Sequence, residues 1–173
     1  MSNVLFVVAG ENYRDEEYFV PAEILKNNGH KIFTASDISK SEAAIGADGG
    51  EVIIDYNINE VEPNDFDLIV FVGGPGALAH LDNEASYKLL QEAEKLGKKL
   101  AAICIAPVIL AKAGVLKGKK ATVWASPMDK KAIKILEENK AIYSSAPVIS
   151  EEIITANGPA AAEEFGNTLI SVL

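Results

Sequence analysis

The sequence predicts an α/β fold with a doubly wound, mostly parallel sheet, and three observations carry this prediction. Short, continuously apolar runs of the kind that form strands buried on both faces recur along the chain. Stretches of helical length alternate with them, and glycines stand where several of those helices would end. The chain has no internal repeat, linker or low-complexity segment, so we expect residues 1–173 to form a single domain.

The expected strands of the main sheet are short, and three of them, at residues 4–8, 68–72 and 100–103, contain no polar residue. Such runs are typical of parallel strands that helices cover on both faces. We expect them at residues 4–8, 30–35, 68–72, 100–103 and 121–124. Shorter β segments are expected near Val148 and Ile153. Asp48-Gly49-Gly50 separates two further short runs, at residues 43–45 and 51–54, which predicts a small hairpin.

The expected helices alternate with these strands, at residues 16–28, 83–96, 105–113, 126–139 and 160–173. Glycine follows three of them and suits the left-handed conformation that often ends a helix. Ser126 is expected to cap the fourth helix, with Pro127 at its first position. In doubly wound sheets ligands bind beyond the carboxyl ends of the strands, so we expect the functional site there.

The composition narrows the classes of function. The net charge of −9 and the pI near 4.7 argue against nucleic acid or an anionic membrane as partner, because phosphate binding requires clustered Lys and Arg. One cysteine excludes an internal disulfide, and the two histidines, His30 and His80, lie far apart, so we expect neither a metal site nor another cofactor. No apolar stretch reaches the roughly 18 residues of a membrane span, and no secretory leader precedes the first strand. A cytoplasmic protein is therefore expected.

Cys104 stands where a buried strand is expected to run directly into a helix. Its neighbours Ala101, Ala102 and Ala106 are small, and Pro107 suits a first helical turn. A tight strand-to-helix elbow pushes the side chain at its corner out of the sheet, and a helix N-terminus lowers the pKa of a thiol from about 8.5 toward roughly 3.5–7.5. The spacing favours a nucleophilic or oxidisable thiolate, with a buried structural cysteine as the alternative.

A glycine-rich turn, Gly73-Gly74-Pro75-Gly76, follows the apolar run at residues 68–72. Free backbone N–H groups in such a turn can face the same cavity as Cys104 and stabilise an oxyanion. The turn lacks the G-x-G-x-x-G and G-K-[ST] patterns of phosphate-binding loops. A plain strand-to-helix turn is the structural alternative.

Three motifs, taken in their order and spacing, resemble a known family. They are A-I-C-x-[AG]-P after a buried strand, G-G-x-G-A about 30 residues earlier, and E-x-x-x-P in the first helix, the last formed here by Glu17 and Pro21. This arrangement is similar to the ThiJ/PfpI superfamily, also called DJ-one/PfpI, which shares its fold type with the class I glutamine amidotransferases. The resemblance covers nearly the whole chain. It implies a flavodoxin-like three-layer sandwich with a cysteine nucleophile elbow.

The resemblance also implies roles for individual residues. Cys104 would be the nucleophile or redox-sensitive thiol, and Glu17 the buried carboxyl that hydrogen-bonds its sulfur. The backbone N–H groups of Gly74 and Ile105 would form the oxyanion hole. The other residues expected around the pocket are Gly73, Trp124 and Pro159. Without the resemblance, Glu17 is interpreted as an ordinary acid in a first helical turn, where acidic residues suit the helix dipole.

The sequence departs from the family at both usual histidine positions. Ile105 stands directly after the cysteine, where protease-like members carry His, and Trp124 stands where the parkinsonism-associated branch has one. Leu78 replaces the acid that protease-like members carry after the glycine-rich turn. Classical peptidase activity is therefore not expected, because His is the commonest proton carrier in such sites. His80 is a further candidate for that role, with a solvated histidine as the alternative, and Trp124 either narrows the pocket or packs in the core.

Two classes of function fit these residues. In the first, a cysteine-dependent hydrolase or lyase acts on small carbonyl or acyl compounds, in the glyoxalase, deglycase or amide-hydrolase manner that the resemblance implies. In the second, a non-enzymatic redox sensor or stress protein responds when Cys104 is oxidised to a sulfinate. A pocket that binds a small molecule without turnover stays open as a third interpretation. The resemblance also implies a homodimer, with apolar Tyr18, Phe19 and Val20 of the first helix at its interface.

Overall fold

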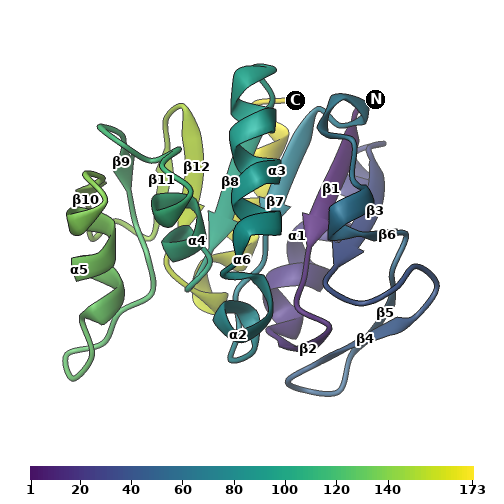
Figure 1. Cartoon of the computed structure of the whole chain (residues 1–173), viewed down its shortest axis with the longest axis horizontal. Coiled ribbons are helices and arrows are strands. Elements are labelled where there is room, and N and C mark those ends of the chain that lie inside the picture. The colour runs from purple at the N-terminus through teal and green to yellow at the C-terminus, as the bar shows by residue number, and fades with distance from the viewer.

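A seven-stranded sheet forms the centre of the computed structural model, which describes residues 1–173 (Figure 1). All neighbouring strands are parallel except the last pair at one edge, β12 and β11, which is antiparallel. The strands, in their order across the sheet, are β11 (Val148–Ser150), β12 (Ile153–Ala156), β8 (Lys99–Ile103), β7 (Leu68–Phe71), β1 (Asn3–Val7), β3 (Lys31–Ser36) and β6 (Tyr56–Asn57). The mostly parallel, doubly wound α/β fold expected from the sequence is confirmed.

The central strands are apolar on both sides because both of their faces are covered. Along β1, Leu5 and Val7 join one cluster of buried side chains, whereas Val4 and Phe6 join the other. Successive side chains of a strand point to opposite faces, so a continuous apolar run supplies two cores at once. The strands align in register, with Val4 beside Leu68 of β7.

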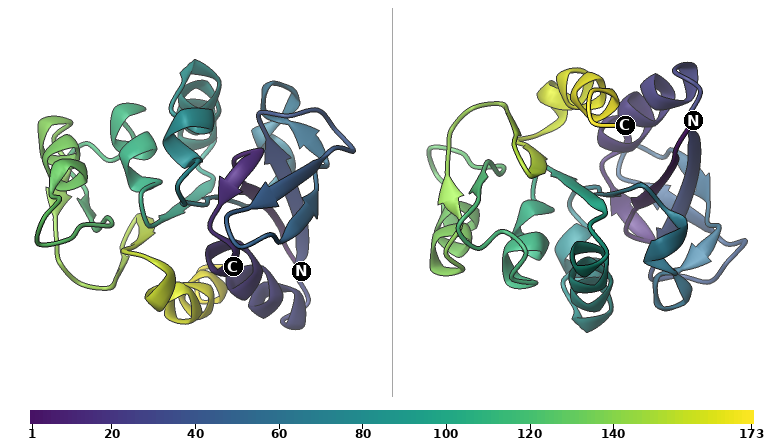
Figure 2. Two further views of the ribbon diagram at one scale, coloured as in Figure 1. Left: turned by 90° about the horizontal axis from the view of Figure 1, so that it is seen from below. Right: turned by 90° about the horizontal axis from the view of Figure 1, so that it is seen from above.

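Helices form a layer on each side of this sheet (Figure 2). One layer holds α1 (Asp15–Asn27) and α6 (Ala162–Ile170), and the other holds α2 (Ala77–Leu81), α3 (Glu84–Lys95), α4 (Pro107–Lys112) and α5 (Lys131–Glu138). The two helices of the first layer lie close together at Gly166. A Cβ on Gly166 would lie 2.8 Å from Cδ1 of Ile24, so a larger residue there would push the helices apart.

Two small sheets and three 3₁₀ turns lie outside the main sheet. The hairpin expected around Asp48-Gly49-Gly50 is confirmed as an antiparallel pair, β4 with β5, and β2 joins it beside β4. The Asp15 carboxylate at the start of α1 accepts hydrogen bonds from the backbone N–H groups of Gly50 (2.6 Å) and Asp48 (2.9 Å), which fastens the hairpin turn to the helix. These smaller elements are β2 (Glu11–Tyr13), β4 (Ala43–Gly46), β5 (Glu51–Ile53), β9 (Lys120–Ala121), β10 (Ile142–Tyr143), η1 (Ile58–Glu60), η2 (Pro63–Asp65) and η3 (Pro159–Ala161).

Two expected elements differ in the structure. The strand expected at residues 121–124 contracts to β9, which pairs with β10 rather than with the main sheet. The expectation that Ser126 caps a helix is wrong, because Ser126 and Asp129 bridge each other and form a separate turn. The Asp129 carboxylate accepts instead from the N–H of Lys131 (3.0 Å), where α5 begins.

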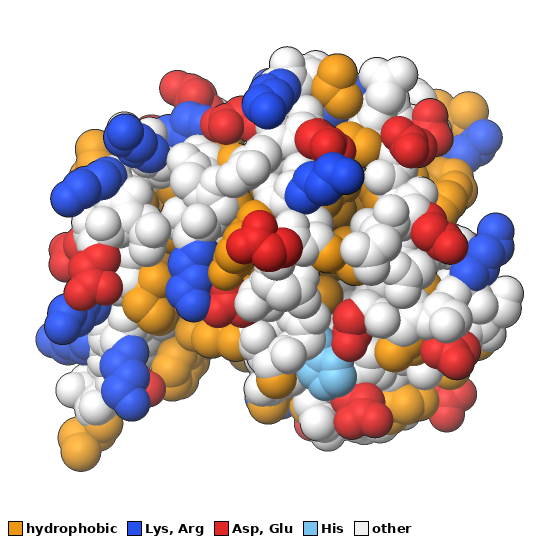
Figure 3. All heavy atoms as spheres, viewed as in Figure 1, with side chains coloured by type: hydrophobic (Ala, Val, Ile, Leu, Met, Phe, Trp, Pro, Cys, Tyr) orange, Lys and Arg blue, Asp and Glu red, His pale blue; other side chains and the backbone are white.

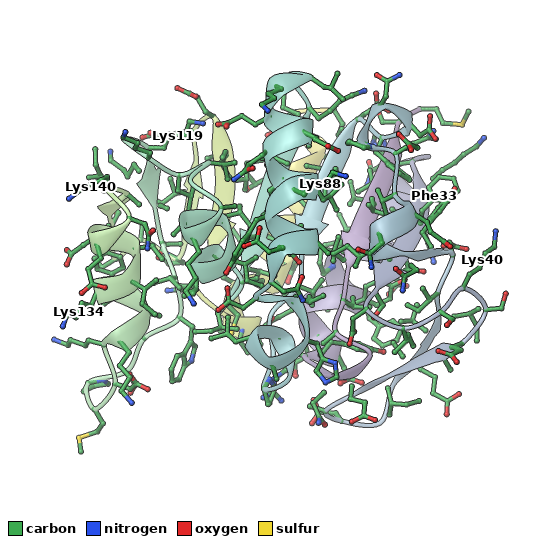
Figure 4. The ribbon with its side chains drawn as sticks, in the orientation of Figure 1. Phe33, Lys40, Lys88, Lys119, Lys134 and Lys140 are labelled. Carbon is green, nitrogen blue, oxygen red and sulfur yellow. The ribbon has the colours of Figure 1, made fainter.

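The surface mixes charges of both signs. On the face drawn in Figure 3, Lys and Arg side chains lie among Asp and Glu side chains, and no single sign dominates. Lys119, labelled in Figure 4, pairs with Glu94 of α3 at 2.7 Å. No helix combines the length and the apolar composition that crossing a membrane would require.

On α1, the expected row of exposed apolar residues is shorter than the sequence indicated. Tyr18 is buried against Phe6, whose ring centroid lies 5.4 Å away, because it faces the sheet. Phe19 is 39% exposed, and Ile53 on the neighbouring β5 is 59% exposed. The apolar surface of this region therefore involves the hairpin as well as the helix.

Candidate active site

Cys104 occupies the elbow that the sequence predicted, directly after β8. Its φ is +65°, a left-handed conformation that costs a residue other than glycine about 1–3 kcal/mol. Two backbone hydrogen bonds hold it there: the Cys104 N–H donates to the Ala156 carbonyl, and the Cys104 carbonyl accepts from the Trp124 N–H, both at 2.8 Å. The chain then turns through residues 104–106 into α4, which begins at Pro107. The fold thus maintains a strained conformation at the one cysteine.

Glu17 lies beside this elbow, in the first turn of α1. Its side chain is fully buried, and neither carboxyl oxygen has a hydrogen-bond partner of ordinary geometry. Burial without such a partner disfavours the charged carboxylate, so the surroundings of Glu17 favour its protonated form. Pro21, one turn later, lacks the N–H that would otherwise bond to the Glu17 carbonyl.

Gly73 lies against both the Cys104 and the Glu17 side chains, and it has no side chain of its own to separate them. A Cβ on Gly73 would lie 2.7 Å from Cβ of Cys104 and 2.7 Å from Oε2 of Glu17, closer than such atoms approach. The cysteine and the carboxyl can therefore adjoin one another only because this position carries no side chain. This assigns the first glycine of the Gly-rich turn a specific steric role.

Burial dominates the electrostatics of this pair. It raises the pKa of Glu17 to about 7, against the opposing effects of the Cys104 thiol, the Gly73 backbone and Arg14. It also raises the pKa of the Cys104 thiol, as does the nearby Glu17 carboxylate. The expected lowering of the thiol pKa by a helix N-terminus is therefore wrong in direction, because the short α4 does not outweigh desolvation.

The two groups titrate as a coupled pair. The first proton to leave creates one negative charge, and a second charge beside it is opposed by repulsion and by burial. The pair therefore loses the first of its two protons as pH rises through about 7, and it keeps the second, on the carboxyl or on the sulfur, above neutral pH. Whenever the carboxyl holds it, a thiolate faces a neutral acid.

Two backbone N–H groups favour the charge on sulfur. Those of Ile105 and Gly74, the residues expected at an oxyanion hole, lie at Cys104 and lower the pKa of its thiol. Gly74 has a φ of +117°, and a Cβ there would lie 2.3 Å from the backbone nitrogen of Arg14. Only glycine fits this turn, so its N–H is fixed in position.

A cavity of about 370 Å³ lies at the carboxyl ends of β7 and β8. These strand ends point toward the lower side of Figure 1. It brings together the expected site residues Cys104, Glu17, Gly74, Ile105, Trp124 and Pro159. Its walls also contain Leu78, Pro75 and Arg14. Trp124 is 38% exposed at its edge, so it forms part of the wall rather than of the core.

Arg14 is the site residue that the sequence analysis missed. It immediately precedes α1, and its backbone N–H donates to the Gly73 carbonyl at 3.0 Å. The signal was its spacing, because a residue three positions before Glu17 shares the same face of a helical turn.

Neither histidine lines the cavity. His80, a candidate proton carrier in the sequence analysis, lies in α2 and pairs through Nδ1 with the Asp37 carboxylate at 2.5 Å. Burial raises the pKa of Asp37, but hydrogen bonds from His80, the Gly10 backbone and Ser36 outweigh it and leave that pKa below its ordinary value. His30 accepts a hydrogen bond from the Ser2 N–H at 3.3 Å. Ile105 and Trp124, the two positions at which the resemblance implies a histidine, both line the cavity.

No group of three or more His, Cys, Asp or Glu side chains is arranged to hold a metal ion. The groups that the cavity presents are a thiol, a buried carboxyl, backbone N–H groups and one residue with a guanidinium.

Comparisons with known proteins place these features in a family. The chain is 37% identical over 174 residues to an uncharacterized protein of Methanocaldococcus jannaschii, covering 99% of this chain and 82% of that protein. It is 35% identical over 126 residues to "Deglycase PfpI" of Pyrococcus furiosus, which covers 73% of this chain and 74% of the relative. It is 27% identical to "Glutathione-independent glyoxalase DJR-1.2" of Caenorhabditis elegans, over 99% of this chain and 88% of the relative.

Solved structures agree with this placement. A ThiJ/PfpI domain protein from Brachyspira murdochii matches with a TM-score of 0.90 and 31% identity, over 98% of this chain and 95% of that one. DJ-1beta of Drosophila melanogaster matches with a TM-score of 0.82 and 27% identity, over 99% and 96% of the two chains. The sequence profile of the DJ-1/PfpI family matches residues 2–172. The chain therefore belongs to the DJ-1/PfpI family.

Proposed function

We propose that this protein is an enzyme that acts on small carbonyl or acyl compounds through Cys104 and Glu17. The observation that carries the proposal is the cavity in which a thiol at a strained elbow, a buried carboxyl and two backbone N–H groups converge. The names of two relatives, a deglycase and a glyoxalase, support the substrate class.

In this proposal the thiolate of Cys104 attacks the carbonyl carbon. The C–S bond forms as the C=O π pair moves onto oxygen, and the Gly74 and Ile105 N–H groups stabilise that oxygen. For an amide, the pair then reforms C=O, the C–N bond breaks, and Glu17 protonates the leaving amine. Water next cleaves the thioester, giving its proton to Glu17 and returning the thiol.

With a 2-oxoaldehyde the same groups catalyse an isomerisation. Neutral Glu17 first gives its proton to the oxyanion that thiolate attack creates, and so becomes a carboxylate. This carboxylate takes the proton from the carbon that bears sulfur and delivers it to the neighbouring carbon, while the hydroxyl proton passes to the neighbouring oxygen and a thioester forms. Water then cleaves the thioester to the hydroxy acid, giving its proton to Glu17 and returning the thiolate. Glu17 suits both roles because its pKa, raised to about 7, lets it give and take protons near neutral pH. No histidine is needed in this scheme.

The cavity also argues against a classical peptidase. Its volume of about 370 Å³ suits a small molecule, and Ile105 stands at the position of the protease histidine.

Turnover of methylglyoxal to lactate tests the proposal. We expect activity in the wild type, none above background in Cys104→Ala, and a loss of at least about a hundredfold in Glu17→Gln, a typical contribution of a general acid–base. Equal rates in the wild type and Cys104→Ala would overturn it. Amide and ester substrates of similar size would then define the reaction type.

A second candidate is a redox sensor, which the absence of histidine beside Cys104 favours. Peroxide would oxidise the thiolate to a sulfenate with release of water, and a second peroxide would give the sulfinate. Glu17 would donate a hydrogen bond to the oxidised sulfur. Mass spectrometry after mild peroxide treatment tests this candidate: oxidation of Cys104 no faster than in the denatured chain would reject it.

We also propose that the protein forms a homodimer. Phe19 of α1 and Ile53 of β5 are exposed apolar side chains on one side of the molecule, as an interface between two copies would require. Light scattering tests this, since a monomer at micromolar concentration would refute it.

A further inference from the structure

Arg14 is the one basic residue among the nine that line the cavity. The other lining residues are apolar, or offer backbone N–H groups, or form the Glu17–Cys104 pair. A chain with a net charge of −9 repels anions in general. The positive charge of Arg14 acts on Glu17, whose pKa it helps to lower, so it forms a local exception to this repulsion at the cavity.

The guanidinium has donors to spare. It has five N–H donors, of which the structure engages one, Nη1, in a 3.3 Å contact with the Asp48 carboxylate. Asp48 is 59% exposed, and Arg14 is 33% exposed. An ion pair this exposed is weak, so a carboxylate within the cavity can compete for Arg14. Bidentate contact with a carboxylate is the geometry that guanidinium favours.

The backbone of Arg14 contacts the Gly-rich turn that supplies the Gly74 N–H of the proposed oxyanion hole. Its N–H donates to the Gly73 carbonyl at 3.0 Å, and its nitrogen lies against Gly74, where no Cβ could fit. The Arg14 backbone therefore packs directly against the turn that carries the Gly74 N–H. Arg14 and Cys104 both line the cavity, so one small molecule bound there can contact both residues.

We propose that Arg14 selects substrates that carry a carboxylate close to the reacting carbon, such as 2-oxo acids and carboxylate-bearing acyl compounds. This inference rests on the function proposed above, since it names the class of compound that the same cavity takes. Arg14 is a specificity-determining residue: it binds the anionic group and leaves the chemistry to Cys104 and Glu17.

Alkylation of Cys104 tests the selection without any turnover. Iodoacetate and iodoacetamide differ in charge but hardly in size. With either one, the thiolate attacks the CH₂ carbon, the C–S bond forms, iodide leaves, and the thiol proton passes to the buffer. Because the chain has one cysteine, the mass increase reports this site alone. The measured quantity is the ratio of the iodoacetate rate to the iodoacetamide rate.

We expect this ratio in the wild type to exceed that of the urea-denatured chain, and Arg14→Gln to lower it about tenfold, the size of a charge-assisted hydrogen bond. Asp48→Asn, an exposed change that frees Arg14 from its partner, should raise the ratio a few-fold. Added salt should diminish both differences. If Arg14 acts only on the charge of the Glu17–Cys104 pair, Arg14→Gln will change both rates by the same factor, and the unchanged ratio overturns the proposal.

A second measurement, of ligand binding, tests the proposal if Arg14→Gln folds poorly or if the thiol reacts too slowly to be alkylated. Trp124 is the only tryptophan and lines the cavity, so its fluorescence reports binding directly. In Cys104→Ser, which cannot be alkylated, pyruvate should bind more tightly than the isosteric neutral pyruvamide, and Asp48→Asn should widen the difference. Equal affinities would overturn the proposal.

These outcomes separate the inference from the proposed function. If the alkylation-rate ratio depends on Arg14 but the protein shows no turnover, the carboxylate selection is supported and the proposed enzymatic function is rejected. Turnover of neutral methylglyoxal that survives Arg14→Gln, with an unchanged alkylation ratio, keeps the enzyme and rejects the selection.

Discussion

Two acidic side chains near the same edge of the sheet contrast sharply in their surroundings. Asp37, after β3, accepts hydrogen bonds from the Gly10 backbone at 2.8 Å, from Ser36 at 3.1 Å and from His80. Glu17, near the ends of β7 and β8, is fully buried without any such partner. The pKa of the first is lowered and that of the second is raised to about 7. The comparison teaches that the balance between burial and hydrogen bonding sets the direction of the pKa shift: hydrogen bonds outweigh burial at Asp37, and burial outweighs them at Glu17.

The largest expected effect concerns turnover. Cys104→Ala should abolish the methylglyoxal activity, whereas His80→Gln should change it less than about twofold, because His80 is absent from the cavity lining. Steady-state rates of lactate formation measure both. A large loss of activity in His80→Gln would contradict the distinction between the structural Asp37–His80 pair and the Glu17–Cys104 site.

A steric test follows for Gly73. Gly73→Ala should lower activity more than about tenfold and stability by about 1–3 kcal/mol, because the added Cβ would lie 2.7 Å from both Cβ of Cys104 and Oε2 of Glu17. The matched control is Gly49→Ala, at a φ of +87° in open space, which adds only backbone strain of about 1 kcal/mol. Activity assays and urea denaturation compare the two. Equal activity losses in both variants would contradict the steric role.

The raised pKa of Glu17 predicts a pH dependence of stability. Since the folded state binds this proton more tightly than the unfolded one, Glu17 contributes stability below its ordinary pKa of 4.5 that is lost as pH rises through about 7. The free energy of unfolding should fall over that window by up to about 3 kcal/mol, and Glu17→Gln should flatten the curve. Urea denaturation between pH 5 and 8 measures this, with exposed Glu23→Gln as control. A wild-type curve parallel to that of Glu17→Gln would contradict the raised pKa.

The opposite sign is expected for Asp37, with the smallest effect. Its lowered pKa contributes stability that is present above its ordinary value of 3.8 and lost as pH falls through the folded-state pKa. Asp37→Asn should therefore cost about 1–2 kcal/mol at pH 7, and the two proteins should converge in stability at low pH. Equal stability at pH 7 would show that the Asp37–His80 pair contributes nothing measurable.

Sequence reasoning succeeded where local pattern and tertiary structure agree. The apolar runs that became β1, β7 and β8 specify their own burial, and the elbow at Cys104 follows from one such strand entering a helix. The thiol pKa was expected in the wrong direction because a local argument, the helix dipole, cannot weigh desolvation by the rest of the chain.

The other differences arose from long-range contacts and turn chemistry. The spacing of Arg14 from Glu17 places both residues on one helical face, but the site also requires the turn after β7 to meet the start of α1, which is a long-range contact. His80 follows the Gly-rich turn in sequence, yet Asp37, far away along the chain, determines its contacts. Ser126 matched the sequence pattern of a helix cap, but it forms a local turn with Asp129 instead.

The edges of the main sheet have a consequence for behaviour at high concentration. β6 offers two residues at one edge, and antiparallel β11 offers three at the other. Long, flat edges present rows of free N–H and C=O groups that recruit strands from other molecules. Edge strands of two and three residues offer few free N–H and C=O groups for another strand to pair with. The short edge strands therefore protect the apolar sheet from edge-to-edge aggregation.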